Sequence, residues 1–445
     1  MNHRISSVMT VLLYCAVGVC CAVVGLHLLL RLPSAPVIGP AQALPVDFIW
    51  GVSSSAFQSE GGDIDSNILR ENKQSIDPGK KLQDAYGSSV DFRHRYREDI
   101  ALAKQLGVNT YRIGISWARI EPLKGQIDAT ELAYYDDVIA ALKQAGIQPL
   151  ITLDHFVYPG WVADQGGWTN ARTLDDFMKY ADLIARRYHG DVRWWLTFNE
   201  TPAYMVIDIV ARASGLGGAA AIRQNIISAH RLSYELIHRL DPHAMVSSNI
   251  PWTGDTTVSR LVQEATNWAF LNQISDRMDY VAVDYYASDL LALLGDSSAW
   301  YPDPPGLYRV LRYLSKRFPQ LPLLVTENGM ATDNGEPRAD GVRREDALRD
   351  SVYWVQRARA NGINVIGYMV WSLTDNFEWG SYTPRFGLYT VNVMRDKSLV
   401  RIPTAAVPAY RKIISEQGVP AEYRPVLPPE RPVNPPKAIP LSPGH

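Results

Sequence analysis

The sequence is almost without cysteine. Its three cysteines, Cys15, Cys20 and Cys21, all lie near the start of the 445-residue chain. The rest of the chain therefore has no thiol for a disulfide or a thiolate metal site, and cysteine content says nothing about the redox compartment. The sequence also has no cluster of His, Cys and Asp residues with the spacing of metal ligands. We therefore expect neither a metal nor another cofactor.

The chain has no excess of charge of either sign, with 44 Lys and Arg against 46 Asp and Glu. This balance provides no basic surface for nucleic acid and no acidic tail, so we expect no nucleic-acid partner. Aromatic residues are plentiful by contrast, with 12 Trp and 23 Tyr. Most of them are expected in the core, although Trp and Tyr rings also suit the apolar faces of sugars.

The first long apolar run covers residues 8–30, in which His27 is the only ionisable side chain. A helix of this length rises about 34 Å, enough to cross a bilayer core of about 30 Å. A cleavable signal has a shorter apolar stretch, of about 7–15 residues. We therefore expect residues 1–30 to be a signal anchor, with the catalytic domain outside the cytoplasm. The alternative is a cleaved export signal and a secreted protein, with a cleavage-like motif at Ala41-Gln42-Ala43.

Composition divides the remaining chain into three parts. Residues 31–45 are small and contain proline, which predicts a linker. Residues 419–445 are rich in proline and poor in large apolar side chains, which predicts a disordered tail. The single folded domain is expected to cover 46–418.

Within that domain, short apolar runs alternate with segments of helical periodicity. Eight strands that are each followed by a helix predict a parallel (β/α)8 TIM barrel. An open doubly wound sheet is the structural rival, but no glycine-rich phosphate loop follows the first strand. The expected strands are Phe48–Val52, Thr110–Ser116, Pro149–Asp154, Trp194–Asn199, Met245–Asn249, Tyr280–Tyr285, Leu323–Thr326 and Val365–Trp371. The expected helices are Phe92–Leu106, Thr130–Ala145, Thr173–Tyr188, Ala219–Leu240, Val258–Ile274, Leu307–Arg317, Arg344–Asn361 and Val407–Glu416.

Two strand ends carry a glutamate, Glu200 in Thr197-Phe198-Asn199-Glu200 and Glu327 in Val325-Thr326-Glu327-Asn328-Gly329. Either glutamate alone could cap a helix or pair with an arginine. In a parallel barrel, however, all strand ends open on one face, so two distant glutamates can meet across one pocket. Two facing carboxyl groups are what the cleavage of a glycosidic bond requires. We expect Glu200 to be the general acid and base and Glu327 the nucleophile, with Arg112 holding a carboxylate ionised.

Several longer motifs occur in a fixed order along the domain, and together they resemble family 1 glycoside hydrolases, the β-glucosidase and β-galactosidase family of clan A. The resemblance runs from Phe48 to about Ile414. The segments that carry it are Phe48-Ile49-Trp50-Gly51, Ser55-Ala56-Phe57-Gln58-Ser59-Glu60-Gly61, Tyr96-Arg97-Glu98-Asp99-Ile100, Tyr111-Arg112-Ile113-Gly114-Ile115-Ser116-Trp117, Asp154-His155-Phe156, Gly166-Gly167-Trp168, Trp371-Ser372-Leu373-Thr374-Asp375-Asn376-Phe377-Glu378-Trp379 and Arg385-Phe386-Gly387.

The resemblance implies a carbohydrate-binding site around the two glutamates. Glu200 would be the acid/base, Glu327 the nucleophile, and Tyr286 the tyrosine that hydrogen-bonds the nucleophile. The Glu378-Trp379 pair favours an unphosphorylated β-glucoside or β-galactoside. The residues expected to bind the sugar are Gln58, His155, Asn199, Tyr286, Trp371, Glu378 and Trp379, and the expected supporting residues are Arg112, Asp284 and Phe386.

The chain departs from the family pattern at several positions. Thr201 replaces the usual proline after the acid/base, and Asp284 replaces the usual asparagine two residues before the tyrosine. Val157 and Tyr158 replace the usual Asp-Leu. A third carboxyl at Asp284 would raise the pKa of a neighbouring carboxyl if it pointed into the pocket. The stretches after Glu200 and after Tyr286 also read as short, which predicts an open, shallow acceptor site.

Three functions follow as hypotheses, and the expected one is a membrane-anchored retaining β-glycosidase. The second is a membrane-associated transglycosylase that passes the sugar to a glycolipid or glycan, because residues 161–168 and the anchor are similar to the galactolipid galactosyltransferase branch of the family. The third is a catalytically inactive sugar-binding module, although such relatives usually lose one of the two glutamates. The oligomeric state does not follow from the sequence.

Overall fold

The computed structural model describes residues 39–62, 64–74, 84–204, 215–253, 257–288, 300–333, 335, 337, 338, 340–378 and 380–427. The expected transmembrane helix at 8–30 lies outside these residues, as does Trp379. No helix within the described ranges is long and apolar enough to cross a membrane. The membrane anchor therefore stays a prediction.

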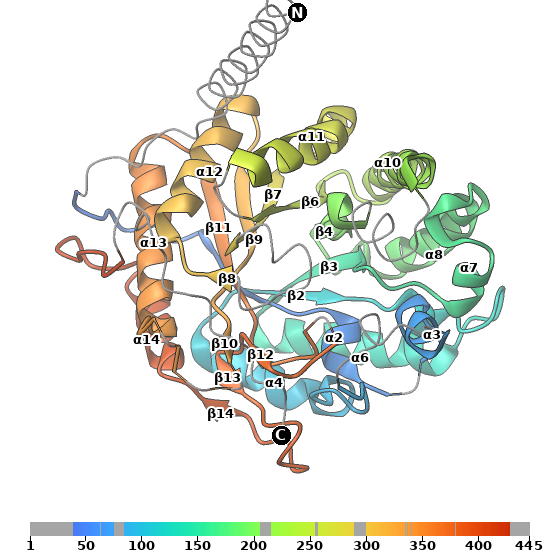
Figure 1. Cartoon of the computed structure of the whole chain (residues 1–445), viewed down its shortest axis with the longest axis horizontal. Helices are drawn as coiled ribbons and strands as arrows, with labels where there is room; N and C mark the ends of the chain where they lie inside the picture. Colours follow the sequence, from blue (N-terminus) through green and yellow to red (C-terminus); the bar gives the residue numbers. More distant parts are fainter. Residues whose placement is uncertain are drawn as a thin grey trace, which may run out of the picture.

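Parallel strands form the centre of the fold and helices surround them (Figure 1). The strands follow the order β5-β4-β3-β2-β1-β11-β9-β7-β6. Only Ser248 separates β5, which pairs with β4, from β6, which pairs with β7. The two therefore occupy a single strand position, and the sheet closes into a barrel of the predicted (β/α)8 type.

The elements lie close to the predicted ranges, and one long helix follows each of the eight strand positions of the barrel. The barrel strands are β1 Ile49–Ser53, β2 Thr110–Gly114, β3 Gln148–Asp154, β4 Trp194–Phe198, β5 Met245–Ser247, β6 Asn249–Thr253, β7 Val281–Ser288, β9 Leu323–Asn328 and β11 Val365–Trp371. The outer helices are α4 Phe92–Leu106, α6 Ala129–Ala145, α8 Arg172–Tyr188, α10 Gly215–Leu240, α11 Thr257–Ile274, α12 Pro304–Arg317, α13 Arg344–Ala360 and α14 Ala406–Ser415. The shorter elements are α2 Ala56–Glu60, α3 Asn67–Gln74, α5 Trp117–Ile120, α7 Gly160–Asp164, β8 Trp300–Tyr301, β10 Thr332–Asp333, β12 Pro384–Arg385, β13 Tyr389–Thr390 and β14 Ile402–Pro403.

Local sequence explains why these elements begin and end where they do, as α6 illustrates. The Asp128 side chain accepts hydrogen bonds from the backbone amides of Thr130 and Glu131, which would otherwise lack partners at the helix start. Gly146 ends the helix in the left-handed region, at φ 77°, where a residue without Cβ fits most easily. The helix thus ends at Ala145, and two residues separate it from β3, which begins at Gln148.

The barrel interior changes character along its length. Its amino-terminal part is filled by a cluster of apolar side chains from β1, β3, β4, β7, β9 and β11 and from the residue just before β7. Its carboxyl-terminal part holds buried polar groups, including Arg112, Asn199, Asp284 and Glu327. The apolar layer closes one end, so the polar groups open only towards the loops that follow the strands. The members of the apolar cluster are Ile49, Leu150, Trp194, Leu196, Tyr280, Ala282, Leu324 and Met369.

The packed region reaches past both expected limits of the domain. Before residue 46, the amide of Leu44 donates to the carbonyl of Gln417 at 2.7 Å. After residue 418, the hydroxyl of Tyr423 donates to Asp350 at 2.7 Å, and the amide of Val426 donates to the same carboxyl at 3.1 Å. A buried carboxylate on α13 thus binds the first part of the proline-rich tail through groups that composition alone does not reveal.

Candidate active site

Glu327 points into the barrel interior because the sheet is irregular at its strand. Along β7 and β9, Val283 pairs with Val325 but the next residue, Asp284, pairs with Glu327. The extra residue, Thr326, is a bulge, and bulges re-aim side chains next to active sites. Glu327 therefore lies directly beside Asp284 and is only 5% exposed.

Two donors hold the carboxyl group of Glu327. Nη1 of Arg112 donates to Oε1 at 2.5 Å, and the hydroxyl of Tyr286 donates to Oε2 at 2.9 Å. Burial raises the pKa of Glu327 above its ordinary value, and the charge of Arg112 and the bond from Tyr286 offset part of that rise. Of the two expected catalytic glutamates, Glu327 is therefore the one with a cation and a hydroxyl donor bonded to its carboxyl group.

Glu200 is set in a sharp turn just after β4. Its backbone has a φ of 41°, in the left-handed region that non-glycine residues seldom adopt. Its amide donates to Oδ1 of Asn249, at the start of β6, at 3.0 Å, and this bond fixes the turn. Burial, and then the charge of Glu327, raise the pKa of Glu200 to about 8. No hydrogen bond reaches its carboxyl from the described residues, so the protonated form is favoured.

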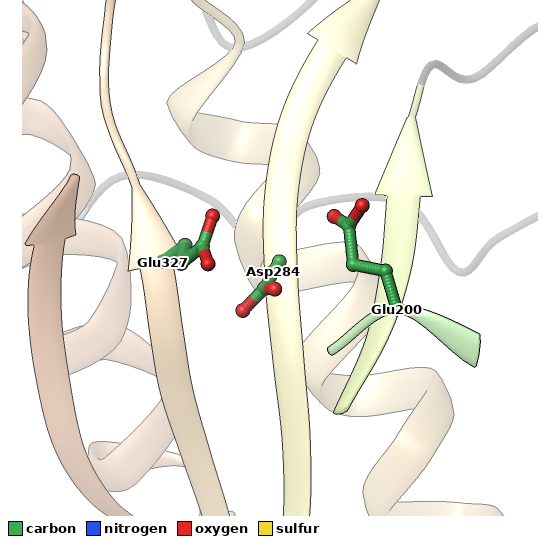
Figure 2. A group of neighbouring side chains, drawn as sticks. All are labelled: Glu200, Asp284 and Glu327. Carbon is green, nitrogen blue, oxygen red and sulfur yellow. The ribbon is translucent and has the colours of Figure 1, made fainter. Parts of the chain in front are cut away.

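Glu200 and Glu327 lie near the carboxyl-terminal ends of β4 and β9, and Asp284 lies between them (Figure 2). One carboxyl oxygen from each of the three lies within 4.8 Å of the others. Although three carboxyls at such distances can surround a metal ion, Nη1 of Arg112 already lies 2.5 Å from Glu327 and 3.9 Å from Asp284. The cluster thus contains its own cation, in the position that Arg112 was expected to take.

Asn249 was missed by sequence reasoning, although it links several of these groups. Its Nδ2 donates to Oδ1 of Asn199 at 2.7 Å and to Oδ2 of Asp284, while its Oδ1 accepts from the amide of Glu200. A polar residue at the end of the predicted strand Met245–Asn249 was the available signal. Thr326, which donates to Asp284 at 2.6 Å, was likewise overlooked within a named motif.

Asn199 and His155 lie next to the same guanidinium. Nη2 of Arg112 donates to Oδ1 of Asn199, and Nδ2 of Asn199 lies 3.2 Å from Nε2 of His155. Burial, and then the charge of Arg112, lower the pKa of His155 well below its ordinary value. A neutral His155 and an oriented Asn199 thus offer uncharged hydrogen-bonding groups beside the two glutamates.

Gln58, Trp371 and Glu378 form a second hydrogen-bonded group near these residues. Nε1 of Trp371 donates to Oε1 of Glu378 at 2.6 Å, and Nε2 of Gln58 donates to Oε2 at 3.1 Å. Nε2 of Gln58 also donates to Asn376, a residue that the sequence prediction did not single out, at 3.2 Å. Burial raises the pKa of Glu378 to about 8. The group presents amide and carboxyl functions of the kind that bind sugar hydroxyls.

Aromatic rings also pack against one another at this site. The rings of His155 and Trp371 stack at a centroid distance of 5.9 Å, and Phe386 meets Tyr286 edge-on at 5.8 Å. The structure thus brings together every predicted site residue except Trp379, which lies outside the described residues. Residues 205–214 and 289–299, which would shape the acceptor side, also lie outside them, so the shallow acceptor site stays a prediction.

Comparisons with known proteins agree with this geometry. The family model described as "Glycosyl hydrolase family 1" matches residues 41–252 and 292–419. "Beta-glucosidase 42" of Arabidopsis thaliana is 28% identical over 86% of this chain and 96% of its own length. "Beta-glucosidase A" of Thermotoga maritima is 26% identical over 80% of this chain and 95% of its own. A solved structure, "beta-glycosidase from Pyrococcus horikoshii", is 26% identical with a TM-score of 0.73, covering 85% of this chain and 96% of that one.

Proposed function

The chain belongs to glycosyl hydrolase family 1, and we propose from this that it is a retaining β-glycosidase of unphosphorylated β-glucosides and related β-glycosides. The similar proteins of Arabidopsis thaliana and Thermotoga maritima are both described as beta-glucosidases. Their description supports a glucoside as the first substrate to test, with a galactoside as the second.

The separation of the two glutamates is the observation that carries the proposal. Oxygen atoms of Glu200 and Glu327 lie within 4.8 Å of each other. Retaining glycosidases have carboxyl groups about 5–5.5 Å apart, whereas inverting enzymes need about 6.5–9.5 Å to admit a water molecule. The spacing therefore favours direct attack by one carboxylate on the sugar.

The reaction that fits this spacing has two steps. In the first, an oxygen of Glu327 bonds to the anomeric carbon, while the bond to the leaving oxygen breaks and that oxygen takes the proton of Glu200. In the second, the Glu200 carboxylate takes a proton from water, and the water oxygen displaces Glu327 from the anomeric carbon. Both carboxyls then return to their starting states. The raised pKa of Glu200 suits the first step, and the donors on Glu327 favour the ionised form of its carboxyl and orient it.

The stereochemistry of the first product tests this assignment. Proton NMR recorded during hydrolysis of an aryl β-glucoside should show β-glucose before mutarotation produces the α-anomer. Initial α-glucose would contradict the two-step mechanism. A sugar-binding module without activity would give neither anomer, and transfer to an added alcohol or glycolipid would give a new β-glycoside instead of glucose.

We further propose that residues 8–30 anchor the enzyme in a membrane with the barrel outside the cytoplasm. The support is the length of the apolar run in the sequence. Intact mass and alkaline extraction of membranes from cells that express the full chain test it. An anchored chain retains residues 1–30 and stays in the membrane fraction, whereas a cleaved signal yields a shortened chain in the soluble fraction.

A further inference from the structure

Asp284 is a third buried carboxyl group at this site, and the two-step mechanism leaves it without a role. Its side chain is fully buried, and it pairs in register with Glu327 across β7 and β9. Oxygens of Glu200, Asp284 and Glu327 lie within 4.8 Å of one another (Figure 2). A carboxyl group in that position must either add a negative charge to the site or carry a proton.

The charged groups that face Asp284 come from three strands, β9, β4 and β2. Glu327 faces it from β9, Glu200 from the end of β4, and Arg112 from β2, with Nη1 3.9 Å from its Oδ1. The other contacts, Thr326 and Asn249, are uncharged, and burial keeps His155 neutral. If Glu200 is protonated, an ionised Asp284 would leave one uncompensated negative charge against the single guanidinium, while a protonated Asp284 leaves none. Burial of an unpaired charge is strongly unfavourable.

The hydrogen bonds lead to the same conclusion. Asp284 accepts from Thr326 at one oxygen and from Asn249 at the other, and one of its oxygens lies within 4.8 Å of an oxygen of Glu327, its register partner on β9. Two carboxylates have no proton between them, so these neighbouring groups can share a hydrogen bond only if one of them is a carboxylic acid. Arg112 and Tyr286 already stabilise the carboxylate of Glu327. The proton therefore belongs to Asp284.

We propose that Asp284 is a permanently protonated positioning residue that donates a hydrogen bond to the nucleophile Glu327. This inference rests on the proposed function for its mechanistic consequence. Together with Arg112 and Tyr286, Asp284 gives the Glu327 carboxylate three donors from three directions. They fix its orientation towards the anomeric carbon, and the proton of Asp284 stays in place through both steps.

Infrared spectroscopy of the substrate-free protein tests where the proton lies. At neutral pH, the difference spectrum of wild type minus Asp284→Asn should contain the carbonyl band of a protonated carboxylic acid. Labelling of aspartate with ¹³C should shift that band, which distinguishes it from a band of Glu200. Asp303→Asn is the matched control, because Asp303 lies 2.9 Å from Arg309 in an ion pair and should lose a carboxylate band instead. A carboxylate band lost in Asp284→Asn would overturn the proposal.

Kinetics test the consequence for the nucleophile. Asp284→Ala removes the donor and should lower kcat/KM roughly 10- to 100-fold. Asp284→Asn restores a neutral donor and acceptor, so it should recover most of that loss and keep the alkaline limb of the pH profile within about 0.5 pH unit. A limb moved down by a full unit or more would mean that Asn had replaced an ionised Asp284. The infrared result does not depend on turnover, so failure of the glycosidase assignment would not be mistaken for failure of this one.

Discussion

The guanidinium of Arg112 donates to Glu327 at 2.5 Å inside the barrel, and Arg112 is itself completely buried. The two residues come from β2 and β9, which are distant in sequence. Glu327 bonds directly to this buried cation, whereas the carboxyl of Glu200 makes no such bond within the described part of the chain. In the proposed mechanism, the contact with Arg112 therefore suits Glu327 to the role of nucleophile.

Replacement of Arg112 by lysine should therefore impair catalysis more than substrate binding. Lysine keeps the charge but cannot bond Glu327, Thr152 and Asn199 together as the guanidinium does. We expect kcat for an aryl β-glucoside to fall roughly 100-fold, and the acid limb of kcat/KM to move to higher pH. The control is Arg309→Lys, which alters an ion pair with Asp303 outside the catalytic group. Equal losses in both variants would contradict the role of Arg112.

Removal of the acid should affect substrates according to their leaving groups. Glu200→Ala should lower the rate constant for glycosylation roughly 10²–10⁴-fold for alkyl β-glucosides, because their alkoxide leaving groups need a proton. Glycosylation by dinitrophenyl glucosides should change little, since that leaving group departs as an anion. Pre-steady-state measurement of phenolate release separates glycosylation from the later hydrolysis. The same loss for both substrate types would exclude Glu200 as the acid.

The pH dependence of the free energy of unfolding should show how much Glu200 destabilises the folded protein when it is ionised. The pKa of Glu200 is raised in the folded protein, to about 8. The folded state therefore holds this proton more tightly than the unfolded state, so stability falls as pH rises from about 4.5 to 8. Glu200→Gln removes this loss of stability. Its free energy of unfolding should exceed that of wild type by on the order of 2 kcal/mol at pH 9 and differ little from it at pH 4. Urea unfolding of both proteins at the two pH values measures this difference in stability. The same difference at both pH values would contradict the raised pKa of Glu200.

Loss of Glu378 should weaken recognition of the sugar. Trp371 and Gln58 each donate a hydrogen bond to one oxygen of its carboxyl and so fix the orientation of that group. Glu378→Ala should lower kcat/KM for β-glucosides roughly 100-fold, and the loss should be smaller for a substrate that lacks the hydroxyl which Glu378 binds. Comparison of wild type and variant with a series of monodeoxy glucosides identifies that hydroxyl. Equal losses across the series would mean that Glu378 acts only in folding.

The sequence predicted the barrel strands well, and the structure brings the two expected glutamates together, although their catalytic roles stay a prediction. Buried parallel strands are continuous apolar runs, and a glutamate that ends such a run is unusual enough to be noticed. The bulge at Thr326 and the bridge formed by Asn249 depend on register between strands, which periodicity within one strand does not contain. The same holds for the contacts of Asp350 with Tyr423 and Val426 in the expected tail.

The central claim is that Glu327 forms a covalent bond with the sugar, and mass spectrometry of a trapped intermediate tests it most directly. Wild type incubated with a 2-deoxy-2-fluoro β-glucoside that carries a dinitrophenyl leaving group should gain the mass of one fluoroglucosyl unit, and peptide mapping should place that unit on Glu327. Glu327→Gln should gain nothing. A label on another residue, or rapid turnover by wild type joined by equal turnover by Glu327→Gln, would contradict the account.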